Sequence, residues 1–227
     1  MPAEIKILSA GAVKPGLTKV IEAFQKKTGQ KINISFATAP AIVERIGSGE
    51  SFDIVIAPPQ VLDELANSRK VSRTEHIAVG SIGVGVMVRN GAPLPQIATV
   101  DDFKQSLLRA ESLIYNQAST GIYLDALFDR LGGDLKAKSK RYADFAAVLE
   151  HVSKGSGREI GFGATTVIIE NKTNGIQFAG PLPAEIQNYT TYAAVAVPRG
   201  TDESAQAFTR HLASPPARDI FAAAGIT

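Results

Sequence analysis

The chain contains no cysteine and no long run of apolar residues in its 227 positions. The lack of cysteine excludes disulfide bonds and thiolate metal sites. It does not indicate a compartment, because cysteine-free proteins are compatible with both the periplasm and the cytosol. No stretch approaches the roughly 18–20 apolar residues that a membrane-spanning helix needs. The sequence therefore offers no candidate for a spanning segment.

An excess of charge of one sign is also missing. The chain has 24 Lys and Arg against 22 Asp and Glu, a formal net charge of +2, and the basic residues are scattered. Nucleic-acid binding is therefore not expected, because it needs a concentrated basic face. The three histidines, His76, His151 and His211, have no metal-ligand spacing, and no Ser-His-Asp or Gly-x-Ser-x-Gly arrangement occurs. We expect neither a metal site nor a cofactor.

The chain opens on Met1-Pro2-Ala3-Glu4 and then enters a predicted strand, without the pattern of a signal peptide. We therefore expect a periplasmic protein if a leader has been removed, and a cytoplasmic protein otherwise. The length of 227 residues allows one domain or two smaller ones, and it is enough to bury a core.

Short apolar strands alternate with amphipathic helices almost to the end of the chain, which predicts α/β layers. Two strand–turn–helix units open the sequence, with strands at residues 5–8 and 32–36. Helix N-termini favour negative charge, and ligands of open α/β sheets bind at the carboxyl edge of the strands. We therefore expect an anion-binding cleft formed by four strand-to-helix turns. These turns are predicted at residues 9–12, 37–41, 116–121 and 164–166.

Two strands are expected to carry the chain between two lobes. The first covers residues 77–88 and is rich in glycine, which weakens a strand and often marks a bend; the second covers residues 192–197. The predicted fold is α/β with two lobes, each a mixed, mostly parallel sheet flanked by helices. Lobe 1 would comprise residues 1–84 and 194–227, and lobe 2 residues 85–193.

Local signals also predict helix ends. Thr99 is a suitable N-cap, with Asp102 three residues later, for a helix that carries Phe103 and Leu107. Gly132-Gly133 is expected to end the helix that follows the third turn.

Five short motifs follow one another in an order that resembles type 2 periplasmic solute-binding proteins, and within them the molybdate-binding branch. The resemblance covers essentially the whole chain. It implies two lobes that close by a hinge on a small anion, which neutral donors bind. The motifs are Ser9-Ala10-Gly11-Ala12, Ser35-Phe36-Ala37-Thr38, Phe52-Asp53-Ile54-Val55-Ile56, Thr120-Gly121-Ile122-Tyr123 and Ile160-Gly161-Phe162-Gly163.

The resemblance implies binding positions at Ala12, Ala39, Thr120, Phe145 and Ala164, with their backbone N–H groups. The molybdate-type site has serine hydroxyls at the positions of Ala12 and Ala39 and a tyrosine hydroxyl near Ala164, and this sequence lacks all three. A dry cage for a tetrahedral oxyanion would then lack three donors, and unpaired buried oxygens are costly. We therefore expect a ligand other than molybdate. The hydroxyls available to it are those of Thr38, Ser119, Thr120, Thr165 and Thr166.

The run from Leu8 to Lys14 is also similar to enzymes of the same superfamily that isomerise small tricarboxylates such as aconitate. Two functions are thus expected. The first is a solute-binding protein, a monomer, that captures an oxyanion or a small di- or tricarboxylate and works with the membrane component of an ABC transporter. The alternative is an isomerase of a small unsaturated tricarboxylate in the same cleft. It needs a base beside an acidic C–H, for which Lys14 and Tyr123 are candidates.

Each candidate residue also has an ordinary structural explanation. Lys14, close to Gly11 in the first turn, is either a carboxylate clamp or proton-transfer group, or a solvated lysine on the rim. Tyr115 and Tyr123 either donate a phenol into the cleft, or pack their rings and expose the hydroxyl to water. The hydroxyl residues suit helix N-caps as well as ligand donors; these are Thr38, Ser119, Thr120, Thr165 and Thr166.

Overall fold

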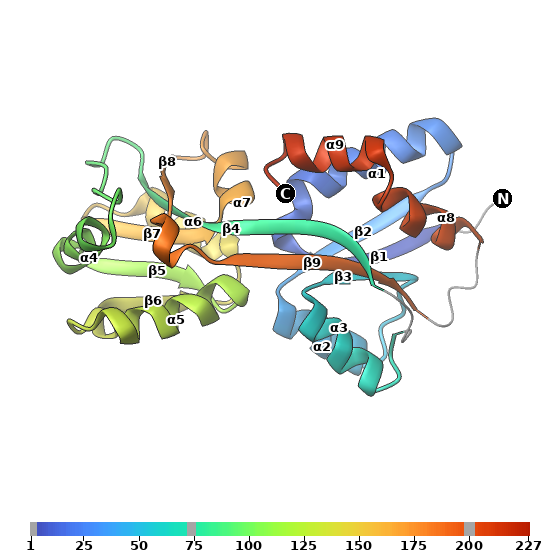
Figure 1. Ribbon diagram of the computed structural model, residues 1–227, viewed down its shortest axis with the longest axis horizontal. Coiled ribbons are helices and arrows are strands. Elements are labelled where there is room, and N and C mark those ends of the chain that lie inside the picture. The colour runs from blue at the N-terminus through green and yellow to red at the C-terminus, as the bar shows by residue number, and fades with distance from the viewer. Residues whose placement is uncertain (1–3, 72–75, 198–202) are drawn as a thin grey trace. The chain divides into compact units, whose positions relative to one another are not determined.

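The computed structural model describes residues 4–71, 76–197 and 203–227, and the chain divides into two compact units (Figure 1). Unit 1 comprises Met1–Ile82 and Thr191–Thr227, and unit 2 comprises Gly83–Thr190. Both boundaries fall inside strands, β4 (Ile77–Arg89) and β9 (Tyr189–Ala196). The boundaries expected from the sequence lie in the same two strands.

The sheet of unit 1 has the strand order β2-β1-β3-β9. Its first three strands are parallel, and β9 is antiparallel to β3. β1 and β3 are almost completely buried, as expected for parallel strands that helices cover on both faces. The parallel strands are β1 (Ile5–Ala10), β2 (Ile32–Ala37) and β3 (Ile54–Ala57).

Helices cover both faces of this sheet, with α1, α8 and α9 on one face and α2 and α3 on the other (Figure 1). α1 buries Leu17, Val20 and Ile21, which recur at helical spacing. Gly16 lets α1 approach α9 closely, since a Cβ there would lie 2.8 Å from the Phe221 ring. The helices are η1 (Gly11–Val13), α1 (Lys14–Thr28), α2 (Ala39–Gly47), α3 (Pro59–Asn67), α8 (Glu203–Leu212) and α9 (Pro215–Ala223).

The sheet of unit 2 has the order β8-β4-β7-β5-β6. Its strands β5, β6 and β7 are parallel, and β4 is antiparallel to both β7 and β8. β6 was not predicted, because its Ser-Lys-Arg-Tyr sequence has no apolar alternation and two of its residues are exposed. The strands are β5 (Ser112–Asn116), β6 (Ser139–Tyr142), β7 (Glu159–Ala164) and β8 (Ile176–Pro181).

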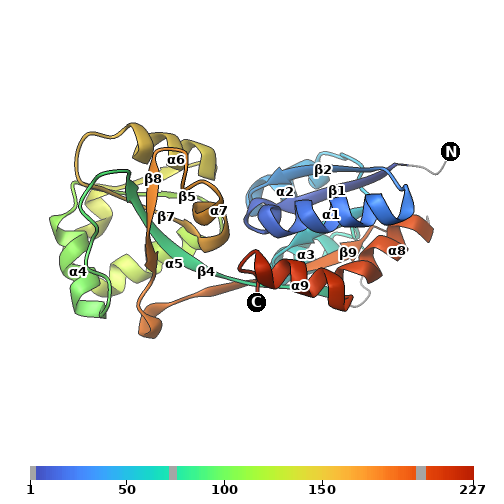
Figure 2. The same cartoon turned by 90° about the horizontal axis from the view of Figure 1, so that it is seen from above.

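Two apolar clusters lie on opposite faces of this sheet. The first packs α4 and α5 against β4, β5 and β7, and the second packs α6 and α7 against the other face. Figure 2 shows α6 on the face opposite to α5. The helices are α4 (Val100–Arg109), α5 (Ser119–Leu131), η2 (Leu135–Lys138), α6 (Phe145–Lys154), α7 (Thr165–Glu170) and η3 (Ala184–Ile186).

Several predicted boundaries are confirmed. Thr99 caps α4 by accepting a hydrogen bond from the backbone N–H of Asp102 at 3.1 Å. Gly132, at φ 67°, ends α5. The predicted turns are too long, because α2 already begins at Ala39 and α5 at Ser119. Among the described residues, every helix is too short or too polar to cross a membrane.

Candidate functional site

The parallel strands of unit 1 end together at one edge of their sheet. Ser9 of β1 is paired with Phe36 of β2 and with Ile56 of β3, and a helix begins just after each strand. We call the residues after these strands, Gly11–Lys14, Thr38–Ala39 and Pro58–Pro59, the unit 1 edge. The structure thus brings together all the site residues predicted in unit 1, which are Gly11, Ala12, Lys14, Thr38 and Ala39.

The helices at the unit 1 edge begin without help from side chains. Val13, Thr38 and Pro58 hold the N-cap positions of α1, α2 and α3, and none of these side chains makes a capping hydrogen bond. No acidic residue lies in the first turn of the three helices. The first N–H groups of a helix have no intrahelical partner and carry partial positive charge; at α1 the Lys14 N–H is already bound to the Gly11 carbonyl. The edge therefore suits an anion.

Gly11 and Lys14 give the unit 1 edge free space and positive charge. A Cβ added to Gly11 would meet no heavy atom within 4 Å, so this glycine faces open space. Lys14 is exposed as the first residue of α1, and its Nζ lies 6.0 Å from the centroid of the Phe36 ring. A cation at this position opposes the helix dipole. It adds positive charge to an edge that has no carboxylate in its first turns.

The unit 2 edge is formed after the neighbouring parallel strands β5 and β7, where α5 and α7 begin. The N-cap positions belong to Ala118 and Ala164, neither of which makes a side-chain cap. The expectation that Ser119 and Thr120 are N-caps is therefore wrong; they are the first two residues of α5, with Thr120 buried. Thr165 and Thr166 are likewise the first two residues of α7, not its N-cap.

The turn before α5 depends on two residues of the predicted turn, Asn116 and Gly121, to which the sequence assigned no role of their own. A Cβ on Gly121 would collide with the backbone carbonyl oxygen of Asn116, so only glycine fits this close approach. The Oδ1 of Asn116 accepts a hydrogen bond from the N–H of Ala118 at 3.2 Å. An asparagine followed five residues later by a glycine at a helix start was the available signal.

Phe145 lies at a helix N-terminus that is already occupied. The Oδ1 of Asp144 accepts the N–H of Ala147 at 2.9 Å and caps α6. The Phe145 ring lies where a Cβ on Gly163 would approach it to 2.6 Å, which indicates a packing role. A carboxylate in place at this N-terminus argues against an additional anion there.

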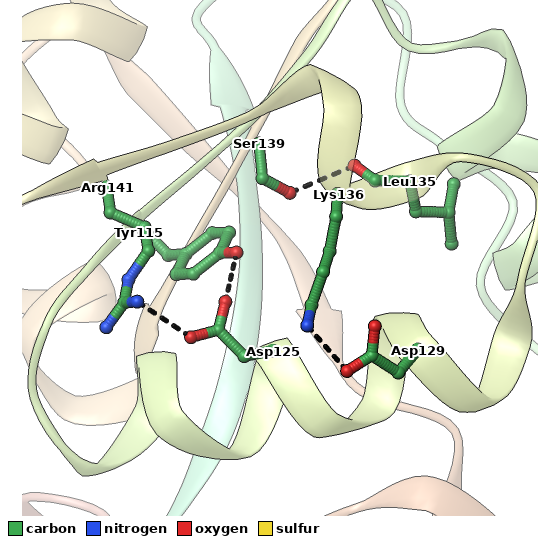
Figure 3. Close-up of polar contacts among 7 residues, drawn as sticks. All are labelled: Tyr115, Asp125, Asp129, Leu135, Lys136, Ser139 and Arg141. Atoms are coloured by element: carbon green, nitrogen blue, oxygen red, sulfur yellow. Dashed lines mark hydrogen bonds and ion pairs between the residues drawn. The ribbon is translucent and has the colours of Figure 1, made fainter.

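Tyr115 packs its ring in the apolar cluster, as one of the two expectations had it, but its hydroxyl is not exposed to water. Its side chain is fully buried, and its hydroxyl donates to Asp125 Oδ1 at 2.7 Å, while Arg141 lies 3.0 Å from the other carboxylate oxygen (Figure 3). Burial, together with the bond to Asp125, raises the pKa of Tyr115 to about 12. The phenol therefore stays protonated and braces β5 against α5.

Tyr123 is also engaged within unit 2. Its hydroxyl donates to the backbone carbonyl of Ile186 at 2.6 Å, and its ring packs against the larger apolar cluster. This bond leaves the phenol proton facing a structural acceptor.

The chain as a whole matches known proteins. A family model described as bacterial extracellular solute-binding protein covers residues 5–227. The chain belongs to this family. An aconitate isomerase from a Pseudomonas species is 30% identical to it over 230 residues, which cover 98% of this chain and 87% of that protein. The predicted membership of the type 2 periplasmic solute-binding proteins is confirmed.

Solved structures share the fold at low sequence identity. The periplasmic molybdate-binding protein of Azotobacter vinelandii has a TM-score of 0.77 at 18% identity, with 98% of each chain covered. The sulfate-binding protein SubI of Mycobacterium tuberculosis H37Rv has a TM-score of 0.78 at 20% identity, covering 99% of this chain and 86% of that one. The predicted two-lobed α/β fold is confirmed.

Proposed function

We propose that the solute of this family member is a small anion, held by helix N-termini at a sheet edge; the unit 1 edge and the unit 2 edge each offer such a set. The observation that carries the proposal is shared by α1, α2, α3, α5 and α7. Each begins at one of these edges without a side-chain cap and without an acidic residue in its first turn. The proposed contacts are Gly11, Ala12, Lys14, Thr38, Ala39, Ser119, Thr120, Ala164 and Thr165.

A di- or tricarboxylate is proposed in preference to a tetrahedral oxyanion. Ala12 and Ala39 carry no hydroxyl at the unit 1 edge, whereas Lys14 adds a cation that can face a carboxylate. A carboxylate accepts charge-assisted hydrogen bonds from both N–H groups and ammonium groups. The 30% identical relative is named for a tricarboxylate, and the relatives named for molybdate and sulfate are at most 20% identical.

Phe145 is left out of the proposed contacts, because Asp144 caps the helix that begins there. Membership of an extracellular solute-binding family supports a periplasmic location and, as partner, the membrane component of an ABC transporter. We propose both on that ground.

The test is thermal unfolding and calorimetric titration with citrate, cis- and trans-aconitate, molybdate and sulfate. A ligand at 100 times its Kd stabilises the folded state by about 2.7 kcal/mol, so a binding tricarboxylate is expected to raise Tm clearly. A larger response to molybdate than to any carboxylate would overturn the preference. No response to either class would overturn the proposal.

Gly11 offers a direct test of the unit 1 edge. Gly11→Ala adds a methyl group that meets nothing in the protein, so folding is expected to be unchanged while the anion is displaced. We expect Kd to rise about tenfold, which is equivalent to about 1.4 kcal/mol. Gly47→Ala is the matched control, because a Cβ there also meets open space but lies at the end of α2. Equal Kd values for the two variants would remove Gly11 from the site.

An isomerase is the second candidate, and the identity to an aconitate isomerase over 98% of the chain favours it. The reaction would remove a proton from the methylene carbon next to a carboxylate, leaving an allylic carbanion, and deliver the proton to the former double-bond carbon at its other end, so that the double bond shifts and its geometry changes. Tyr123 donates its proton to the Ile186 carbonyl, so Lys14 is the preferred base.

Proton NMR with cis-aconitate separates the two candidates. The isomerase is supported if the chain converts cis-aconitate to the trans isomer and Lys14→Ala loses this conversion. Lys19→Ala, on the exposed side of the same helix, is the control and should keep it. If cis-aconitate binds but is not converted, the isomerase is rejected and only the solute-binding function stands.

A further inference from the structure

The strand β4 is held in unit 2 by a side chain that takes the place of a neighbouring strand. Gln187 Oε1 accepts the N–H of Val84 at 2.9 Å, and Gln187 Nε2 donates to the Val84 carbonyl at 3.0 Å. Both backbone groups of Val84 are thus bound by one side chain, as in a ladder pair of a sheet, and the Val84 carbonyl also accepts the N–H of Leu182 at 3.2 Å. Val84 is the second residue of unit 2, next to the boundary inside β4.

Gly83 lies between the unit boundary and Val84, and a side chain at this position would have no room. A Cβ on Gly83 would lie 3.3 Å from the amide atoms of Gln187 and 3.3 Å from the Tyr189 ring. Glycine therefore lets the Gln187 side chain lie directly on the β4 backbone. The Gln187 amide is further fixed because its Oε1 also accepts the N–H of Asn188 at 2.9 Å.

The Gln187 segment is tied in turn to α5. Tyr123 donates its hydroxyl to the carbonyl of Ile186, the residue before Gln187, at 2.6 Å. Tyr123 lies about one helical turn after Ser119 and Thr120. A continuous series of bonds therefore runs from the first turn of α5 through Ile186 and Gln187 to Val84.

On the unit 1 side of the boundary, β4 is held at Ser81. Its N–H donates to the Thr227 carbonyl at 2.5 Å and its carbonyl accepts the Thr227 N–H at 3.0 Å. The hydroxyls of Ser81 and Thr191 lie 2.9 Å apart. The backbone of β4, which also lies next to β9 in the sheet, is thus held at Ser81 and at Val84, with Ile82 and Gly83 between them.

We infer that Gln187 is a positioning residue for solute binding: with Tyr123 it couples the first turn of α5 to β4 and confines bending of β4 to Ile82 and Gly83. A solute that contacts Ser119 and Thr120 then shifts the strand through these bonds. Coupling of this kind is reciprocal, so whatever frees β4 also changes solute affinity. Only this effect on affinity rests on the proposed function.

The first test is amide hydrogen exchange of the full chain without any solute. Gln187→Ala removes the acceptor of the Val84 N–H. We expect the exchange rate of the Val84 amide to rise about tenfold, which corresponds to the net free energy of one hydrogen bond. Gln187→Glu keeps an acceptor for the Val84 N–H but places a carboxylate oxygen against the Val84 carbonyl in place of the Nε2 donor, so it is expected to retain only part of the protection. Gln177→Ala is the matched control, because Gln177 donates to the Ala92 carbonyl in the same unit, away from the boundary. Unchanged Val84 exchange in Gln187→Ala overturns the inference.

The second test measures bending directly. The chain has no cysteine, so Lys26→Cys and Arg130→Cys on exposed helix positions accept spin labels for electron paramagnetic resonance without background. Gln187→Ala and Tyr123→Phe are both expected to broaden the label-to-label distance distribution. Their combination should be no broader than Gln187→Ala alone, because the two act in series.

Matched controls and a probe separate this inference from the proposed function. Tyr142→Phe, which removes a hydroxyl 2.6 Å from His151 Nδ1 elsewhere in unit 2, and Gln177→Ala should leave the distribution unchanged. Equal broadening in either overturns the inference. The Kd of trans-aconitate, used as the probe, should change in Gln187→Ala and not in Gln177→Ala. If trans-aconitate does not bind the unsubstituted chain, the proposed ligand fails. The exchange and distance results still decide the role of Gln187.

Discussion

The two sheet edges are built by different means, although both consist of parallel strands that run into helices. At the unit 1 edge, α1, α2 and α3 each have a proline in the first two positions, and none is capped by a side chain. In unit 2, α5 and α7 are also uncapped, but side-chain hydrogen bonds brace the residues at and beside the edge: Asn116 accepts from the Ala118 N–H, Asp125 accepts from Tyr115, and Asp144 caps the neighbouring helix α6.

This difference has an energetic meaning. Proline restricts the backbone and suits a first helical turn without consuming a donor or acceptor. The loss of one member of a buried polar pair, in contrast, leaves the other unsatisfied at a cost of about 1–3 kcal/mol. The same substitution to alanine should therefore lower the free energy of unfolding strongly in unit 2 and little at the unit 1 edge.

The largest contrast is expected between two glycines. Gly121→Ala places a methyl group on the Asn116 carbonyl oxygen, and the backbone must move to relieve the collision. We expect the free energy of unfolding to fall by about 3 kcal/mol, measured by urea denaturation. Gly11→Ala at the unit 1 edge should stay within about 0.5 kcal/mol. Similar losses in both variants would contradict the comparison.

The next effect concerns the half-buried carboxylate of Asp125 in Figure 3. Asp125→Ala removes the acceptor of the fully buried Tyr115 hydroxyl and should cost about 2 kcal/mol of unfolding free energy. Asp129→Ala on the same helix breaks only an exposed pair with Lys136 and should cost less than about 1 kcal/mol. Chemical denaturation of both variants checks this, and equal losses would argue against the brace.

A smaller contrast is expected at the helix N-caps. Asp144→Ala removes the cap of α6 and should reduce the unfolding free energy by about 1 kcal/mol. Thr38→Ala in unit 1 should have almost no effect, because the Thr38 side chain makes no capping bond. Calorimetric Tm values for the two variants decide this; a larger loss for Thr38→Ala would show that the unit 1 edge does rely on a cap.

The smallest effect is a pH dependence located in unit 1. Burial, with a smaller effect from Lys27, lowers the pKa of His211 below its usual value of 6.5. The unfolded chain therefore takes up a proton before the folded chain does, and the unfolding free energy decreases as pH falls below about 6.5. Denaturation between pH 8 and pH 5 should show this slope, and His211→Phe should flatten it. A slope that persists in His211→Phe would assign it to other groups.

Local sequence patterns predicted the helices and strands better than they predicted the long-range contacts that hold these elements together. The Thr99 cap and the Gly132 stop were readable because their partners lie within a few residues. The bond of Gln187 to Val84 spans more than a hundred positions, and no pattern in a single sequence indicates it. Asn116 and Gly121 lay within a predicted turn and Asp144 beside the predicted site residue Phe145, but their roles rest on hydrogen bonds and a close approach that only the fold reveals.

The placement of the two unit boundaries also has a consequence for synthesis. Unit 2 is one continuous segment, Gly83–Thr190, whereas unit 1 needs Thr191–Thr227 to supply β9, α8 and α9. Domains tend to fold as units while the chain emerges from the ribosome. We therefore expect unit 2 to complete its core first. The sheet of unit 1 can be completed only after β9, α8 and α9 have been synthesised.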